Sequence, residues 1–519
     1  MLLKRKPERK SVLTRDDKRR ARRLAWLIVL GMAAAAALCL WVPTWPLWEP
    51  PAVLPAESQT VVAASAGMDD IRIDAVLDPD ALTLSATQTM TLTNRTGEAQ
   101  PAVVLRSYSG AYLTEETSPA AAEEMFYASY PGKFSPGGLT LTGVRVNGAI
   151  AVYTWLDDAQ TVLSVPVDGA WEPDAPVTLT LTYTVQIPEC AGRFGYDNGV
   201  IALGNVFPTA ALYDDGAWRT DTYTPVGDPF LNACANWHVR LTVPEGWRVA
   251  ATGYAEPAVA DGMQTYVMTA NAVRDFAMVA SDRYHVAAAM EGNVLVAAFA
   301  DTQQAADESV GYLRKALRSY QKHYGPYVYP SLTAASVSMP LAGAAYPRLI
   351  MIPDRHMRSG GQTLEFAVAH ETAHQWWQVM VGSDGWREPW QHEALAEYAL
   401  MDYIGDVYGY ASRESAVFSQ IEASMRITIP RGVTPASPLD YFAGWTEYTQ
   451  VTAMRGASFM VAMETMLGKD ALDRTLADYV QRNLFGFASR EDLTSVLEEA
   501  AGRELDGLMT DYLDTYISN

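Results

Sequence analysis

Short runs of alternating apolar and polar residues fill the chain between residues 69 and 288. Three examples are ALTLSATQTMTLTN at 81–94, TLTLTYTVQI at 178–187 and HVRLTVPEGWRVAATG at 238–253. These runs are rich in Thr, Val and Leu, and Gly, Pro or Asn residues separate them. Alternation of this kind places one face of a strand in a core and the other in solvent. The pattern therefore predicts an N-terminal, mostly antiparallel, β-sandwich-like domain over residues 69–288.

The pattern changes at about residue 289. Strands are expected at VLVAAFA, LTAASVSMP and PRLIMIP, whereas AADESVGYLRKALRSYQKHYG has apolar residues at helical spacing. Beyond Thr363 the helical spacing dominates. The expected helices there cover residues 363–382, 393–409, 455–468, 470–483 and 490–502. A short mixed sheet followed by helices predicts an α+β domain over 289–519, so the fold class is α+β multidomain.

An uncharged apolar run precedes both domains. Residues 24–42 are nineteen apolar residues, which as a helix would extend about 28 Å and cross a hydrocarbon core. Eleven Lys and Arg residues lie in residues 1–23, and they predict a cytoplasmic tail with the remainder outside the cell. The sequence thus favours a single-pass cell-membrane protein whose C-terminal ectodomain is extracellular. A cleaved signal peptide is the alternative. The proline-rich segment 43–68 is expected to be a semi-rigid stalk.

Charge and cysteine content restrict the chemistry. The net charge of -21 divides into +8 for residues 1–23 and -29 for the rest, which argues against a nucleic-acid partner. Outside the apolar run only Cys190 and Cys234 remain. They would form either one disulfide or two separate buried thiols. Three cysteines in all cannot make a thiolate zinc cluster, so a metal site would use His and carboxylate ligands.

The segment VAHETAHQWWQ at 368–378 is the candidate metal site. On a helix, His370 and His374 lie one turn apart and point to the same side. Glu371 lies beside them, where it can accept a proton from a zinc-bound water. Eighteen residues after His374, Glu393 supplies a candidate third ligand, and Glu397 one turn later is a candidate hydrogen-bond acceptor for a ligand imidazole. An HExxH pattern also arises by chance, in which case the histidines would be core or capping residues.

HETAH followed after eighteen residues by EALAEY resembles the gluzincin aminopeptidase family, the group of aminopeptidase N and leukotriene hydrolase. The segments CAGRFGYDNG, LGNVFPTAALYDDGAWRTDTY, GDPF and VPEGWRVAATG are similar to the N-terminal β domain of its bacterial members. YGPYVYPSL and AGAAYPRLIMIP are similar to the start of their thermolysin-like domain, whereas the C-terminal helical-repeat domain of larger members has no counterpart. The resemblance implies one Zn²⁺ per chain, held by His370, His374 and Glu393, with Glu371 as general base and then general acid.

The chain departs from that family at three positions. The family's substrate-lining strand carries a glutamate that grips the free α-amine, and here the strand Gly343, Ala344, Ala345 has alanine in its place. A family tyrosine that stabilises the oxyanion is replaced by Ala453, and Tyr448 is the candidate substitute. His392 stands where Asn or Asp usually precedes the zinc glutamate, either as a local hydrogen-bonding residue or as another proton donor.

The sequence therefore predicts a membrane-anchored, extracellular zinc metallopeptidase that acts on peptide or protein substrates through a Glu371-activated water. The alternative is a zinc-retaining pseudopeptidase that binds peptides or proteins with little turnover. The intact HETAH motif and Glu393 favour an active peptidase, whereas Ala345 and Ala453 favour the pseudopeptidase.

Overall fold

The computed structural model describes residues 55–118, 123–427, 429 and 432–515. All of them belong to one compact unit. The predicted cytoplasmic tail 1–23, the predicted transmembrane helix 24–42 and most of the predicted stalk lie outside the described residues. Within the described part of the chain, no helix is both long enough and apolar enough to cross a membrane.

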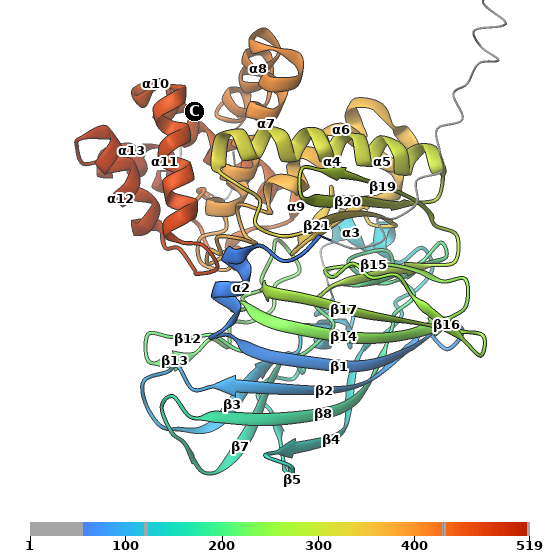
Figure 1. Ribbon diagram of the computed structural model, residues 1–519. Helices are drawn as coiled ribbons and strands as arrows, with labels where there is room; N and C mark the ends of the chain where they lie inside the picture. The colour runs from blue at the N-terminus through green and yellow to red at the C-terminus, as the bar shows by residue number, and fades with distance from the viewer. Residues whose placement is uncertain (1–54, 119–122, 428, 430–431, 516–519) are drawn as a thin grey trace, which may run out of the picture. The chain divides into compact units, whose positions relative to one another are not determined.

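The N-terminal part is built on an eight-stranded sheet (Figure 1). The strands, in order across the sheet, are β16(Ala258–Ala260), β17(Met263–Val273), β14(Ala235–Pro244), β1(Asp69–Asp78), β2(Thr83–Thr93), β8(Pro176–Gln186), β4(Gly138–Val146) and β5(Ala149–Ile150). All neighbours are antiparallel except β1 and β14, which are parallel. Buried and exposed residues alternate along β1 and β2, so the predicted mostly antiparallel β region is confirmed.

Smaller sheets complete this part of the molecule. One sheet contains β15(Arg248–Ala251), β18(Met278–Ser281), β10(Val200–Leu203) and β9(Phe194–Asp197). Another contains β11(Thr209–Ala210), β3(Gln100–Arg106), β7(Val162–Trp171) and β6(Thr154–Trp155), and a hairpin pairs β12(Tyr213–Asp214) with β13(Ala217–Trp218). Two short helices are α3(Glu123–Ser129) and the 3₁₀ helix η1(Tyr108–Tyr112).

Part of the segment predicted as an extended stalk is helical. Helix α2(Gln59–Ser65) begins after Ser58, whose side chain accepts a hydrogen bond from the Val61 backbone N–H. The helix packs against β17, and Val61 is fully buried there. Burial of this side chain together with the Ser58 cap outweighs the extended preference of the proline-rich residues before it.

The second part begins with a mixed sheet, as predicted, and this sheet has five strands. Its order is β19(His285–Glu291), β20(Val294–Ala300), β21(Ser331–Val337), β23(Leu349–Pro353) and β22(Ala344–Tyr346). Strands β20, β21 and β23 are parallel, and every residue in them is buried. Helix α4(Gln303–Tyr324) packs on β19 and β20 (Figure 1). At the opposite edge lies β22, which pairs only with β23.

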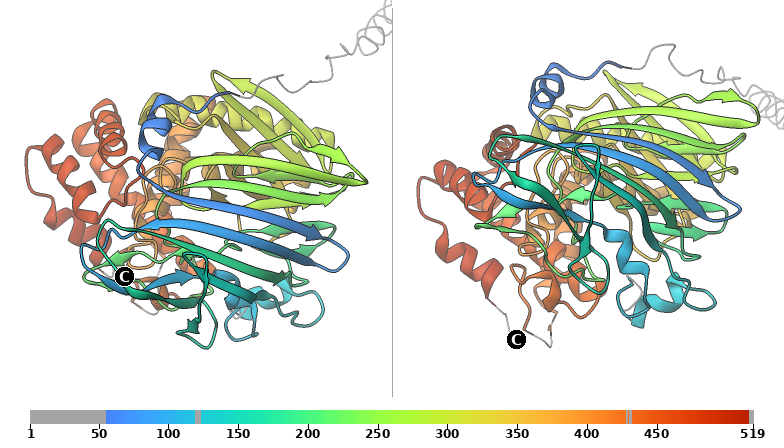
Figure 2. Two further views of the ribbon diagram at one scale, coloured as in Figure 1. Left: turned by 60° about the horizontal axis from the view of Figure 1, so that its bottom comes forward. Right: turned by 90° about the horizontal axis from the view of Figure 1, so that it is seen from below.

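Helices form the rest of the chain. They are α5(Asp354–Ser359), α6(Gly361–Ala373), α7(Trp390–Tyr408), α8(Tyr410–Ala416), α9(Trp445–Tyr448), α10(Gly456–Leu467), α11(Lys469–Arg482), α12(Arg490–Ala501) and α13(Asp506–Met509). Segments of π-helix are η2(Val417–Glu422), η4(Thr449–Arg455) and η5(Thr510–Asp514), and η3(Leu439–Tyr441) is a 3₁₀ turn. Figure 2 shows the last helices gathered beside one end of the strands.

The expected length of the metal-binding helix was wrong. A single helix was expected over residues 363–382, but α6 ends at Ala373, with His374 as its C-cap. The following residues instead form a tight loop closed by hydrogen bonds such as Gln378 N–H to the Val381 carbonyl. Of the two alternatives for the cysteines, the separate thiols are observed, because Cys190 and Cys234 are both free. The Cys190 thiol is buried and donates to the Phe194 carbonyl.

Candidate metal centre

Two helices bring the predicted ligands together. His370 lies in the last turn of α6, His374 caps that helix, and Glu393 lies in the first turn of α7. One ligand atom from each lies within 4.8 Å of the others. Oε2 of Glu393 is 3.9 Å from Nε2 of His370 and 4.0 Å from Nε2 of His374. The two imidazole nitrogens and one carboxylate oxygen therefore face a common point.

The second nitrogen of each imidazole is held by an acceptor. Nδ1 of His374 donates to the Trp377 carbonyl at 3.1 Å. Nδ1 of His370 lies 3.3 Å from Oε2 of Glu397, the residue predicted for this role. Acceptors at Nδ1 fix the ring orientation and leave Nε2 as the ligand atom, as in known metal sites. The short loop after α6 is what brings the Trp377 carbonyl back to His374.

The charges at this centre favour a cation. Burial alone would lower the pKa of His370, but the neighbouring carboxylates of Glu397, Glu371 and Glu393 raise it to about 9. Burial raises the pKa of Glu393, and the nearby imidazoles only partly offset that effect. Both directions mean that the carboxylates lack a compensating positive charge. The donor set, two nitrogens and one oxygen in buried or half-buried positions, fits Zn²⁺ with one position left for a further ligand.

Helix α6 is held in place by a buried carboxylate. Glu365 accepts hydrogen bonds from Tyr403 and Tyr408 at α7 and pairs with Lys315 of α4 at 2.9 Å. Tyr320 of α4 also donates to the Ala369 carbonyl, next to His370. The two neighbouring helices therefore set the position of α6 relative to Glu393.

Glu371 lies against the strand that was predicted to bind substrate. A Cβ added to Gly343 would lie 2.2 Å from Oε1 of Glu371, so the carboxylate sits directly over this glycine. Glu371 is only 6% exposed, and burial raises its pKa to about 8. Ala344 and Ala345 follow in β22, whose outer side is unpaired within the sheet. An extended peptide could add to that edge beside Glu371.

The structure places Tyr448 at the metal centre. Its hydroxyl donates to Oε1 of Glu393 at 3.0 Å, and burial raises its pKa well above the usual value. Ala453, in η4, is buried and offers no hydroxyl. Tyr448 therefore contacts a predicted zinc ligand from the turn before Ala453.

Asp228 is a residue of this centre that the sequence did not single out. It forms an ion pair with Arg193, and its Oδ2 lies 3.4 Å from Nε2 of Gln378. Burial alone would raise the pKa of Asp228, but Arg193 and His392 lower it. The residue lies in GDPF, far from HETAH in the chain, and no local spacing connects the two segments.

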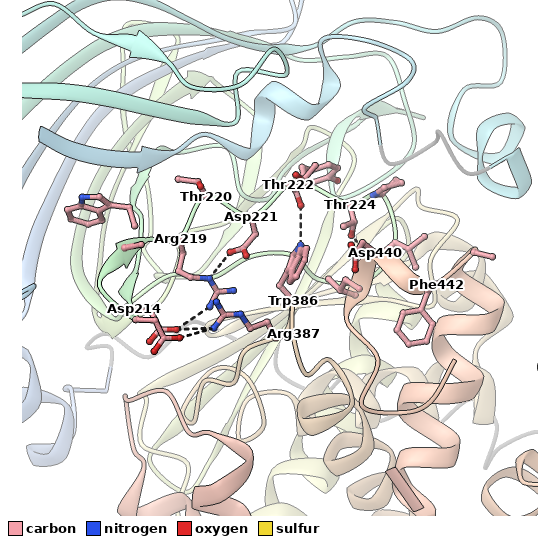
Figure 3. A pocket seen from close by; sticks show the side chains of 18 residues that line it. Asp214, Arg219, Thr220, Asp221, Thr222, Thr224, Trp386, Arg387, Asp440 and Phe442 are labelled. Atoms are coloured by element: carbon pink, nitrogen blue, oxygen red, sulfur yellow. Dashed lines mark hydrogen bonds and ion pairs between the residues drawn. The ribbon is translucent and has the colours of Figure 1, made fainter. Parts of the chain in front are cut away.

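A large cavity lies elsewhere. It measures about 890 Å³, and Figure 3 shows its lining. Arg219 and Arg387 meet Asp214 on one side, whereas Trp386 and Phe442 line the other. None of the predicted metal ligands lines this cavity. Its size therefore does not make it the catalytic site, because the groups that could bind a metal lie outside it.

Comparisons with known proteins agree with this geometry. Residues 338–512 match the peptidase family M1 domain. Aminopeptidase M1-B of Oryza sativa subsp. japonica is 24% identical over 213 residues, which cover 38% of this chain and 24% of that protein. Aminopeptidase N of Lactobacillus delbrueckii subsp. lactis is 24% identical over 236 residues, covering 41% and 27%. Residues 338–512 are therefore similar to the gluzincin aminopeptidases of peptidase family M1.

The fold extends the likeness beyond the matched segment. An M1 zinc metallopeptidase from Deinococcus radiodurans superposes with a TM-score of 0.62 at 15% identity, covering 87% of this chain and 93% of that one. By contrast, the alignments with the curated aminopeptidases span about a quarter of their length. Zinc is the metal of this family, and the ligand set described above fits it.

Proposed function

We propose that this chain is a zinc metallopeptidase that hydrolyses peptide bonds, as its aminopeptidase relatives do. One observation carries the proposal: His370, His374 and Glu393 face a common point, and Glu371, next to His370, lies against Gly343 just before strand β22. A peptide paired with β22 would present its backbone to Glu371. The aminopeptidase names belong to the relatives, and they support the same reaction class for this chain.

The roles of the residues follow from their positions. Zinc, when held by His370, His374 and Glu393, would supply Lewis acidity, lowering the pKa of water and polarising a carbonyl oxygen. Glu371 would take the proton of the attacking water and pass it to the leaving amine. Its raised pKa, about 8, suits a group that must both accept and release a proton near neutral pH.

Tyr448 would act as a positioning residue, because its hydroxyl holds Oε1 of Glu393.

Ala345 brings no charge to the position that grips the α-amine in the family. The proposal therefore covers peptides with free and with blocked N-termini.

We also propose that residues 24–42 anchor the protein in the cell membrane with its C-terminal part outside. Nineteen apolar residues preceded by eleven Lys and Arg residues support this topology. Alkaline extraction of membranes should leave the full chain in the pellet, and deletion of residues 24–42 should release it. Release of the full chain would contradict the anchor.

The catalytic proposal is tested with the full chain in detergent and a mixed peptide library that includes N-terminally blocked members. We expect cleavage that a chelator stops and added zinc restores. Glu371→Gln should lower the rate by about 10²–10⁴-fold while retaining zinc, because a general base contributes that much. Glu504→Gln, a change at an exposed carboxylate, is the matched control. Peptide binding without any cleavage by the zinc-loaded protein would instead establish the pseudopeptidase.

A further inference from the structure

A second group of metal-ligand atoms adjoins the centre described above. Asp228, His392 and Glu393 each place one ligand atom within 4.8 Å of the others. Glu393 is shared with the first group, whereas Asp228 comes from the loop before β14 and His392 from the first turn of α7. Three of the chain's seven histidines thus lie at this place.

The imidazole of His392 is oriented as in a metal ligand, with one ring nitrogen held and the other, within the described part of the chain, unpartnered. The ring is only 2% exposed, and its Nδ1 lies 3.3 Å from the Ser383 hydroxyl. Nε2 has no hydrogen-bond partner among the residues that the structure describes, although it is buried. A buried polar atom without a partner costs about 1–3 kcal/mol and calls for an explanation. One nitrogen held and the other free and buried is the arrangement of imidazoles that bind metals.

The two oxygens of Glu393 face different partners. Oε2 faces His370 and His374, whereas Oε1 lies 3.8 Å from Nε2 of His392. Tyr448 also donates to Oε1, but a carboxylate oxygen has two lone pairs and can accept this bond while binding an ion. Glu393 can therefore bridge two ions.

Asp228 can supply the third ligand atom. Its pairing with Arg193 leaves lone pairs on both oxygens, since an ionised carboxylate has about four acceptor positions. Arg193 reduces the attraction for a second cation, yet its single charge is outnumbered by the carboxylates of Asp228, Glu371 and Glu393.

The separation of His392 and Glu393 suits an ion as well as the separations in the first group do. Ligand atoms on opposite sides of a metal with bonds of about 2.0–2.2 Å are separated by about 4.0–4.4 Å. Nε2 of His392 and Oε1 of Glu393 are 3.8 Å apart, which is inside that limit. In the first group, Oε2 of Glu393 lies 3.9 and 4.0 Å from the two imidazole nitrogens. We propose that Asp228, His392 and Glu393 form a second divalent-cation site, so that the chain holds two ions bridged by Glu393. One nitrogen and two carboxylate oxygens suit Zn²⁺ or Mn²⁺.

The test is a count of bound metal. The full chain in detergent is dialysed to saturation against Zn²⁺, and in a second series against Mn²⁺, and metal per chain is measured by mass spectrometry. We expect two ions per chain for the wild type and one for both His392→Asn and His392→Ala. His285→Asn, which changes an exposed histidine, should keep two ions and is the matched control. Co²⁺ titration followed by visible absorption should show two phases in the wild type and one in His392→Asn.

The outcomes separate this proposal from the peptidase proposal. One ion in the saturated wild type, or two ions in His392→Asn, would overturn the second site and leave the peptidase proposal intact. No ion in the wild type would overturn both. Near-ultraviolet circular dichroism of each variant shows whether it is folded, and agreement of the Asn and Ala variants excludes an effect of one substitution alone.

Discussion

Gly343 leaves the space that the carboxylate of Glu371 fills. A methyl group there would lie 2.2 Å from Oε1 and 2.5 Å from Cδ, which is closer than any real contact, so Glu371 or β22 must move. We expect Gly343→Ala to lower kcat/KM by at least about 10²-fold, since a displacement of about 1 Å in a catalytic group costs that much. Zinc content should be unchanged, because the three atoms nearest the added methyl group all belong to Glu371.

Gly311→Ala is the matched control for this change. Gly311 lies in α4, and a Cβ there would meet no atom within 4 Å. Alanine in a helix is favoured over glycine by about 1 kcal/mol, so this variant should be fully active and slightly more stable. Equal loss of activity in both variants would contradict the proposed contact between Gly343 and Glu371.

Asp275 should make the stability of the protein depend on pH. It is buried and accepts hydrogen bonds from the Phe276 N–H and the Asn205 amide, and burial raises its pKa to about 7. In the unfolded chain the pKa is about 3.9, so between these values the folded state binds more protons. The stability contributed by this group is therefore complete below about pH 4 and is lost as the pH rises to 7.

Denaturant unfolding of wild type and Asp275→Asn measures that effect. The free energy of unfolding of the variant, relative to wild type, should rise between pH 4 and 7, by at most about 1.4 kcal/mol per unit of pKa shift. A constant difference over this range would show that Asp275 does not titrate as described.

At the scale of elements, Glu365 connects three helices. Its carboxylate pairs with Lys315 of α4 and accepts hydrogen bonds from the hydroxyls of Tyr403 and Tyr408. Burial alone would raise the pKa of Glu365, but these contacts hold it below its usual value. Glu365→Ala would leave buried donors without an acceptor, and we expect a loss of about 1–3 kcal/mol in the free energy of unfolding. Glu365→Gln keeps an acceptor and should lose less. Equal stability of wild type and Glu365→Ala would contradict this role.

Periodicity predicted most of these elements because burial on one face is a local property of the sequence. Residues 81–94 and 393–409, for example, correspond to β2 and α7. The end of α6 was not predictable, because the loop after it depends on hydrogen bonds to Val381 that form only in the folded chain.

The metal ligands were predicted from their spacing along two helices. Asp228 was not, since its place beside His392 results from the packing of the β region on the helices.

At the scale of the molecule, Arg219 joins the β region to the helical region. It is nearly buried and pairs with Asp221 at 2.8 Å and with Asp384, before α7, at 2.7 Å. Arg219→Ala would leave both carboxylates without this partner. We expect the free energy of unfolding to fall by about 1–3 kcal/mol. This loss is smaller than that for a fully buried ion pair, because Asp384 is partly exposed. Calorimetry checks this loss. Arg248→Ala, at an exposed arginine, should leave the transition unchanged.

The early end of α6 has a consequence for the electrostatic field at the metal. The aligned peptide dipoles of a helix place about half a negative charge at its C-terminus, and this effect decays within one turn. Because α6 ends at Ala373, its negative pole lies in the turn that carries His370 and His374. A helix continued to residue 382 would have moved that pole about 13 Å away. The backbone of α6 thus adds its own attraction for a cation to that of the side chains.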